Sequence, residues 1–234
     1  LGESALDASV SGGNNTAIGN TSLSALTSGA RNVGVGFESL LNLTTGDDNT
    51  ALGAGALNAC TTASDNVAVG RNSLAVNTTG ANNTALGFKA LDANTTASNN
   101  TAVGSDAMGL NTTGGDNTAC GSIALDANTT GTNNDAFGRN ALGKNTTASN
   151  NVALGNNSLS NNTTGAKNTA GGVSALFTST TSSNNTAFGY QALYANTTGT
   201  ENTALGGNAL NANTTANENT ALGYIALTTN TTGA

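Results

Sequence analysis

The chain has 234 residues, of which only 8% are charged and 3% aromatic, and its formal net charge is −7. Ordinary soluble domains contain about 25% charged residues, so this composition is unusual before any motif is considered. The basic residues are few and scattered, which argues against a nucleic-acid partner, because neutralising phosphates needs clustered Lys and Arg. No apolar run is long enough to span a bilayer, so we expect no membrane insertion.

The chain repeats every 17 residues. A block reading Asn-Thr-Ala-aliphatic-Gly begins at Asn15 and recurs without a slip as far as Asn219. Short, strict periods are typical of solenoids, in which each unit buries its apolar face against its neighbours. The sequence predicts a single repeat domain over residues 1–234 with about 13 full coils. Because it begins and ends within a repeat, we expect it to be a window of a longer chain.

Each unit is numbered here from its first Asn, and its elements follow in chain order. Positions 2 to 5 predict a short strand, with positions 2 and 4 on one face and the small residues at 3 and 5 on the other. Ala-Leu at positions 8 and 9 predicts a second short strand. Asn-Thr-Thr-Gly at positions 12 to 15 predicts a strand end and a turn. Large aliphatic residues recur in nearly every unit only at positions 4 and 9, which does not match a helical stripe.

Two kinds of column are expected when coils stack. Position 9 is Leu in every unit except the one with Met108, which predicts a continuous apolar spine. Asn at positions 1 and 12 predicts amide ladders in which each side chain bonds to the next. The predicted core leucines are Leu57, Leu74, Leu91, Leu125, Leu142, Leu159, Leu193 and Leu210.

These patterns predict an all-β fold, a parallel β-solenoid or β-roll of 17-residue repeats. Its core is thin, because two large apolar side chains per coil must offset the ordering of 17 residues. Packing the position 4 column, for example Val69 and Leu86, against other copies would help. We therefore expect a homo-oligomer, a trimer or fibre; the alternative is a single chain that buries this column internally.

Three segments carry a resemblance to known fibrous proteins. The runs from Asn66 to Gly70 with Ser73, and from Asn151 to Gly155 with Ser158, resemble the head repeats of trimeric autotransporter adhesins. The run from Asn185 to Gly199 resembles repeats of phage tail fibres. The resemblance implies a left-handed parallel β-roll, with three chains around one axis, that serves as an adhesive head or spacer.

Catalysis has little to draw on. The chain lacks His, so no His-based triad or acid–base pair exists. The only acidic pair, Asp47-Asp48, falls in a predicted turn and is interpreted as solvated rather than as a metal or catalytic site. We therefore expect no enzyme activity, no cofactor and no metal site.

The Asn-Thr-Thr segments are also N-glycosylation sequons, in which the Asn amide is a possible acceptor. The alternative is that these residues only build ladders and turns. The possible acceptors are Asn77, Asn94, Asn111, Asn128, Asn145, Asn162, Asn196, Asn213 and Asn230, and Asn-Asn-Thr sequons begin at Asn14, Asn82, Asn99 and Asn184.

The two cysteines lie in different columns and too far apart to bridge. Cys120 replaces an aliphatic residue and is expected as a small core residue. Neighbouring Thr residues such as Thr95 and Thr96 are expected to point to opposite faces. Only one Thr per coil would then face outward, which disfavours an ice-binding array.

The sequence thus favours a non-enzymatic structural segment of an extracellular fibre: an adhesin head, a tail-fibre shaft or a filament on a cell surface or virion. The alternative function is a repetitive surface that binds glycan or ice. The expected contacts with a host surface or glycan lie at variable positions 6, 7 and 10, which include Phe37, Phe88, Tyr190, Tyr194 and Tyr224.

Overall fold

The computed structural model describes residues 2–8, 10–231 and 233 and contains one three-residue strand in each repeat. No helix occurs among these residues. The strands are β1 (Thr16–Ile18), β2 (Val33–Val35), β3 (Thr50–Leu52), β4 (Val67–Val69), β5 (Thr84–Leu86), β6 (Thr101–Val103), β7 (Thr118–Cys120), β8 (Asp135–Phe137), β9 (Val152–Leu154), β10 (Thr169–Gly171), β11 (Thr186–Phe188), β12 (Thr203–Leu205) and β13 (Thr220–Leu222).

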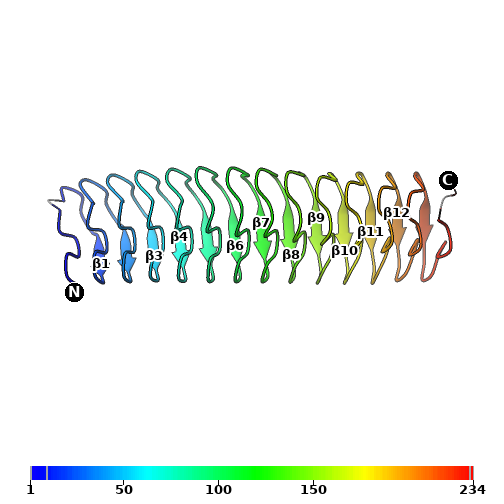
Figure 1. Cartoon of the computed structure of the whole chain (residues 1–234), viewed down its shortest axis with the longest axis horizontal. Helices are drawn as coiled ribbons and strands as arrows, with labels where there is room; N and C mark the ends of the chain where they lie inside the picture. The colour runs from blue at the N-terminus through cyan, green and yellow to red at the C-terminus, as the bar shows by residue number, and fades with distance from the viewer. Residues whose placement is uncertain (1, 9, 232, 234) are drawn as a thin grey trace. The chain divides into compact units, whose positions relative to one another are not determined.

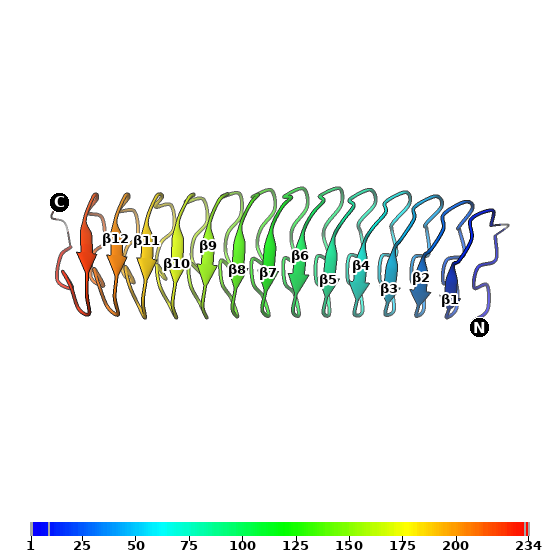
Figure 2. The same cartoon turned by 180° about the vertical axis from the view of Figure 1, so that it is seen from behind.

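The chain divides into two compact units, Leu1–Asp116 with β1 to β6 and Asn117–Ala234 with β7 to β13. Within each unit, every strand pairs in parallel with the next strand in the chain (Figures 1 and 2). The register is one repeat, so that Thr84 lies beside Thr101 and Thr186 beside Thr203. The predicted parallel β-solenoid is confirmed.

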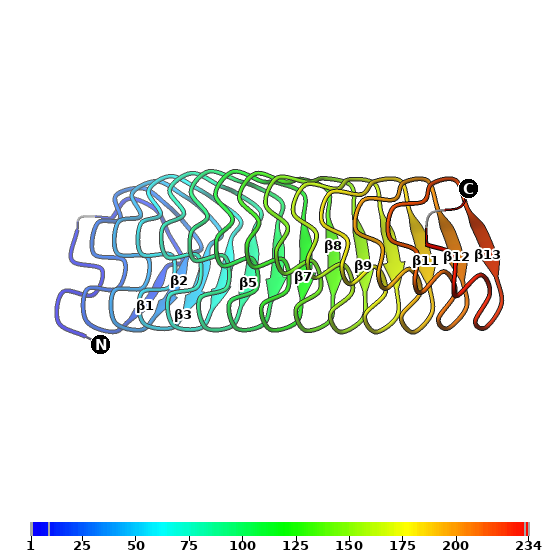
Figure 3. The ribbon, with the colours of Figure 1, turned by 45° about the vertical axis from the view of Figure 1, so that its right-hand side comes forward.

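Hydrogen bonds also join successive coils outside the strands. Figure 3 shows the connecting segments of neighbouring coils following the same path. In the coil that begins at Asn83, seven backbone N–H groups donate to an adjacent coil over 2.8 to 3.1 Å. The donors are Thr84, Gly87, Lys89, Leu91, Ala93, Thr95 and Asn99. Within a unit, a coil is therefore tied to its neighbours around most of its circumference.

The predicted second strand at positions 8 and 9 is wrong, because these residues form turns. Leu91 at position 9 has a φ of +53°, and Lys89 at position 7 has a φ of +54°. Left-handed backbone of this kind is incompatible with an extended strand. It reverses the chain sharply, so that the Leu side chain points into the coil while the N–H of Leu91 still reaches Ala107 in the next coil, over 3.0 Å.

The core of most coils contains one large side chain, at position 9, and several small ones, whereas the first two coils also bury Leu26 and Leu43 at position 12. All eight leucines expected in the spine have no exposed surface, and Met108 fills the same column. Ala at positions 3 and 8 is buried around them, as Ala85 and Ala90 illustrate. The small residues allow the backbone segments on opposite sides of the coil to approach across the Leu column.

Position 5 admits only Gly for two separate reasons. Gly70 has a φ of +128°, which side chains with a Cβ rarely adopt. A Cβ added there would also lie 2.5 Å from the carbonyl oxygen of Gly87 in the next coil. The invariant Gly therefore permits both the turn after the strand and the close stacking of coils.

Candidate functional site

A ladder of buried Asn side chains follows position 1 through each unit. The Oδ1 of Asn66 accepts hydrogen bonds from the backbone N–H and the Nδ2 of Asn83, over 3.0 and 3.2 Å. The Nδ2 of Asn83 also donates to the carbonyl of Ala97 in its own coil over 2.9 Å. The amide thus fastens one coil to the previous one and closes its own coil.

A second ladder follows position 12. Asn94 donates through Nδ2 to the Oδ1 of Asn77 over 2.9 Å and to the carbonyl of Ala97 over 3.0 Å. The carbonyl of Ala97 therefore accepts from both ladders. The predicted amide ladders are confirmed, and their shared acceptor is a feature that spacing along the sequence did not indicate.

The position 12 ladder is interrupted at Ser179. Its hydroxyl lies 2.5 Å from that of Ser182 and does not reach Asn162. The Oδ1 of Asn162 is consequently buried without a hydrogen-bond partner in the described part of the chain. Ser182 compensates on the other side, because its Oγ lies 3.3 Å from the Nδ2 of Asn196 and takes the place of the missing amide oxygen.

The possible glycosylation acceptors at position 12 lie inside the folded coil. The side chains from Asn77 to Asn213 in this column are fully buried, and Asn230 is half-buried. At Asn94, Asn111, Asn145, Asn162 and Asn213, both amide hydrogens are engaged in the ladder and the turn. These groups are structural in the folded coil and do not meet solvent as acceptors.

The strand face directs positions 2 and 4 outward. Leu86 is 38% exposed, Leu154 40% and Phe188 42%, while Ala85 and its equivalents are buried. The alternative in which a single chain buries the position 4 column internally is therefore wrong. The expectation for Cys120 is wrong for the same reason: it stands at position 4 and is exposed, whereas Cys60, at position 12, is the buried cysteine.

The strand face is continuous even where position 4 is Gly. Gly171 is buried, because the ring of Phe188 in the next coil occupies the space that a side chain at residue 171 would take. Asp135, at position 2, is the only ionisable side chain in the described strands apart from the thiol of Cys120. The face is therefore apolar and nearly uncharged, although the chain as a whole is acidic.

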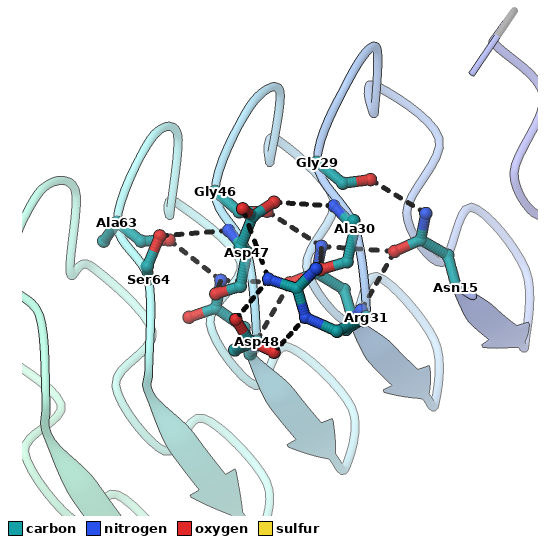
Figure 4. A network of polar contacts seen from close by, with 11 residues as sticks. Asn15, Gly29, Ala30, Arg31, Gly46, Asp47, Asp48, Ala63 and Ser64 are labelled. Atoms are coloured by element: carbon teal, nitrogen blue, oxygen red, sulfur yellow. Dashed lines mark hydrogen bonds and ion pairs between the residues drawn. The ribbon is translucent and has the colours of Figure 1, made fainter. Parts of the chain in front are cut away.

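The acidic pair forms part of a polar network at the turn between coils (Figure 4). Arg31 donates through Nε and Nη2 to the two carboxylate oxygens of Asp48, both over 2.6 Å, and Asp47 Oδ1 accepts from the N–H of Ala30 over 2.7 Å. The hydrogen bond from Arg31 lowers the pKa of the Asp48 carboxyl. No group of three His, Cys, Asp or Glu side chains in the described residues could hold a metal ion.

The expected aromatic contacts occupy different environments. Phe37, Phe88, Tyr190 and Tyr224 are exposed. Tyr194 instead stacks on Phe177 in the previous coil, with ring centroids 5.3 Å apart and planes 4° apart. The four exposed rings share the position 6 column, but no two of their coils are adjacent, so they do not form a continuous aromatic surface.

The Thr pairs divide between structure and surface. Thr95 at position 13 donates through Oγ1 to the carbonyl of Thr112 over 3.1 Å, whereas Thr96 at position 14 is exposed. Position 14 is exposed in the described coils of both units. Of each neighbouring pair from residues 44–45 to 214–215, only the Thr at position 14 is exposed, as expected, and these residues form one column.

No protein-family model, curated protein or solved structure matches the chain. The described residues contain no long apolar helix of the kind that crosses a bilayer. The function must therefore be inferred from the surfaces and columns of the coil itself.

Proposed function

We propose that the chain is a non-enzymatic structural segment of an extracellular fibre, such as an adhesin head, a tail-fibre shaft or a filament on a cell surface or virion. The observation that carries the proposal is the exposed apolar column at position 4 on a coil that is otherwise hydrogen-bonded to its neighbours. Repetition without a converging polar site supports a mechanical role. The variable positions then present side chains along the fibre.

The occupant that fits the strand face is a further copy of the same chain. Position 4 stays apolar in each coil but that of Gly171, although positions 6, 7 and 10 vary freely. Exposed apolar residues retained in this way indicate a contact surface. A second copy presents the same spacing between rungs, so side chains can interdigitate along the whole face. Acidic side chains lie mainly in other columns, which limits repulsion between copies.

The area is adequate for association. A partly exposed Leu and Thr present roughly 100 Å² per coil, so the six strands of the first unit and the seven of the second together offer about 1,300 Å² per copy, which exceeds the roughly 800 Å² per partner of stable interfaces. Burying this area in a trimer, with two contacts per chain, would compensate for the thin core. We expect a homotrimer or a laterally associated fibre.

Light scattering on the full chain tests this assembly. Leu86→Lys with Leu154→Lys places charges on the strand face, and Thr96→Lys with Thr164→Lys is the matched control in the position 14 column. We expect the unmodified chain and the control to be oligomeric and the strand-face variant to dissociate. Bismaleimide cross-linking provides a second measurement, because Cys120 lies on the strand face. A monomer without a Cys120 cross-link would contradict the proposal.

The exposed Thr column at position 14 favours a second candidate, a repetitive surface that binds glycan or ice. Its Thr residues remain exposed while neighbouring outward positions vary. This role would be supported if the full chain bound glycans on an array or showed thermal hysteresis. The activity should be lost in the Thr96→Lys and Thr164→Lys variant and kept in the strand-face variant. Neither activity is expected of a purely structural fibre.

A further inference from the structure

The sequons of this chain fall into two structural classes. Those at position 12 begin with buried amides, whereas those at position 17 begin with the exposed residues Asn14, Asn82, Asn99 and Asn184. We propose that N-glycosylation of the position 12 amides and folding of the solenoid are mutually exclusive. The chain then reaches its fold only where no oligosaccharyltransferase acts on it in the unfolded state. The position 17 amides, in contrast, can bear glycans in the folded coil.

The chemistry of the modification explains the conflict. The amide Nδ2 attacks the anomeric carbon of a sugar carried on a lipid-linked pyrophosphate; an N–C bond forms, the lipid pyrophosphate leaves, and the amide loses one hydrogen as a proton. Asn94 has no hydrogen to spare, because Nδ2 donates to Asn77 and to Ala97. One of these bonds would be lost: either the buried Oδ1 of Asn77 would lose its donor, or the carbonyl of Ala97 would keep only the bond from Asn83.

Space is the stronger obstacle. The side chains of Asn94 and Asn145 have no exposed surface. A glycan on either amide would have to pass through the stack of coils, and it would separate the coil from its neighbours. Because eight fully buried sequons share this geometry, modification of even a few would prevent the ladders from forming continuously.

The order of events decides which process occurs. In the unfolded chain, Asn94 is an ordinary linear sequon. In the folded chain, its column is covered on both sides by Asn77 and Asn111, and Asn111 is synthesised 17 residues later. A transferase that acts on the emerging chain therefore meets Asn94 before the covering coil exists. A chain that has already folded is protected.

Position 17 differs because its side chains point away from the coil. Asn82 and Asn184 lie in turns with φ of +58° and +59° and are exposed. The Thr that completes each of these sequons stands at position 2 on the strand face. Single sequons at Asn20, Asn42, Asn156 and Asn161 also begin with exposed or half-buried residues. A glycan at these sites would extend into solvent.

The proposal is independent of the fibre function, and it restricts how such a fibre reaches the cell exterior. Export through a pathway that glycosylates unfolded chains would destroy the fold. Export without general sequon glycosylation, or assembly in the cytosol followed by release, would preserve it.

The test compares bacterial cytosolic expression with secretion from mammalian cells. Thr→Ala at position 14 removes the buried sequons without altering their Asn residues, because recognition requires the hydroxyl two residues after Asn. The substituted residues are exposed: Thr79, Thr96, Thr113, Thr130, Thr147, Thr164, Thr198 and Thr215. The matched control removes the position 17 sequons by Thr→Val at position 2, where Val67 and Val152 occur naturally; its sites are Thr16, Thr84, Thr101 and Thr186.

We expect the chain without substitutions to resist proteases when it is made in bacteria. In mammalian cells we expect it to be glycosylated at position 12 and retained as an aggregate. The position 14 variant should be secreted in folded form, and the position 2 control should fail as the unmodified chain does. If the position 14 variant does not fold in bacteria, tunicamycin treatment of the unmodified chain replaces it, and secretion should be restored. The proposal would be overturned if mammalian cells secreted the chain without substitutions in folded form, whether its position 12 amides were glycosylated or free. It would also be overturned if tunicamycin failed to restore secretion.

Discussion

Repairing the break in the position 12 ladder should stabilise the solenoid. At Ser179 the ladder lacks an amide, and the Oδ1 of Asn162 is left buried without a donor in the described residues. We consider Ser179→Asn combined with Ser182→Ala, since Ala follows Asn at the equivalent positions Asn94 and Ala97. The second substitution removes the hydroxyl that now occupies the place of the missing amide oxygen.

The magnitude follows from the groups that change partners. In an intact coil, Asn162 itself donates to the Oδ1 of Asn145 over 3.0 Å and to the carbonyl of Gly165 over 2.8 Å. A new Asn at residue 179 would make the same two bonds, and its oxygen would accept from Asn196. Satisfying one buried acceptor is worth about 1–3 kcal/mol. We therefore expect the double variant to be more stable by about that amount.

A double-mutant cycle in chemical denaturation measures the change in the free energy of unfolding. Hydrogen exchange at the Asn162 and Asn196 amides reports on the two repaired contacts. Ser182→Ala alone should destabilise by about 1–2 kcal/mol, because it removes the oxygen near the Nδ2 of Asn196. Ser179→Asn alone should gain little, since Ser182 crowds it. The coupling between the two substitutions is thus expected to be favourable. Additive effects, or a double variant no more stable than the original chain, would refute the ladder argument.

Three other predictions concern single columns. Gly70→Ala should lower the free energy of unfolding by at least about 2 kcal/mol, because it combines positive φ with a backbone clash, and a variant with unchanged stability in chemical denaturation would contradict this. Gly171→Ala should destabilise by about 1–3 kcal/mol through contact with Phe188, and Phe188→Leu in the same chain should recover most of the loss in thermal unfolding. Burial raises the pKa of the Cys60 thiol from 9.0 to about 11. The contribution of this thiol to the free energy of unfolding is therefore complete below pH 9 and falls by about 2–3 kcal/mol as the pH rises to 11. Cys60→Leu should flatten the dependence of stability on pH in this range, and alkylation of the folded protein should occur at Cys120 alone.

The sequence determined the period, and the period determined much of the architecture. A strict 17-residue spacing places equivalent residues one above another, so the Leu column at position 9 and the Asn columns at positions 1 and 12 follow directly from it. The buried Leu91 and the bond between Asn94 and Asn77 show both results. Such columns are predictable because stacking requires only that each coil follow the same path.

The tertiary structure decided which way the columns face. Alternation along a strand separates positions 2 and 4 from position 3, but it does not say which set points inward, because that depends on where the other segments of the coil lie. Turns at positions 7 and 9, with left-handed residues such as Lys89 and Leu91, bring the chain back across Ala85 and leave Leu86 outside. Bulky residues rarely adopt this conformation in isolation, so local preference predicted a strand where the contacts of the whole coil impose a turn. The same closure buries Asn94 and exposes Asn82, and it separates two classes of sequon that are indistinguishable as sequence.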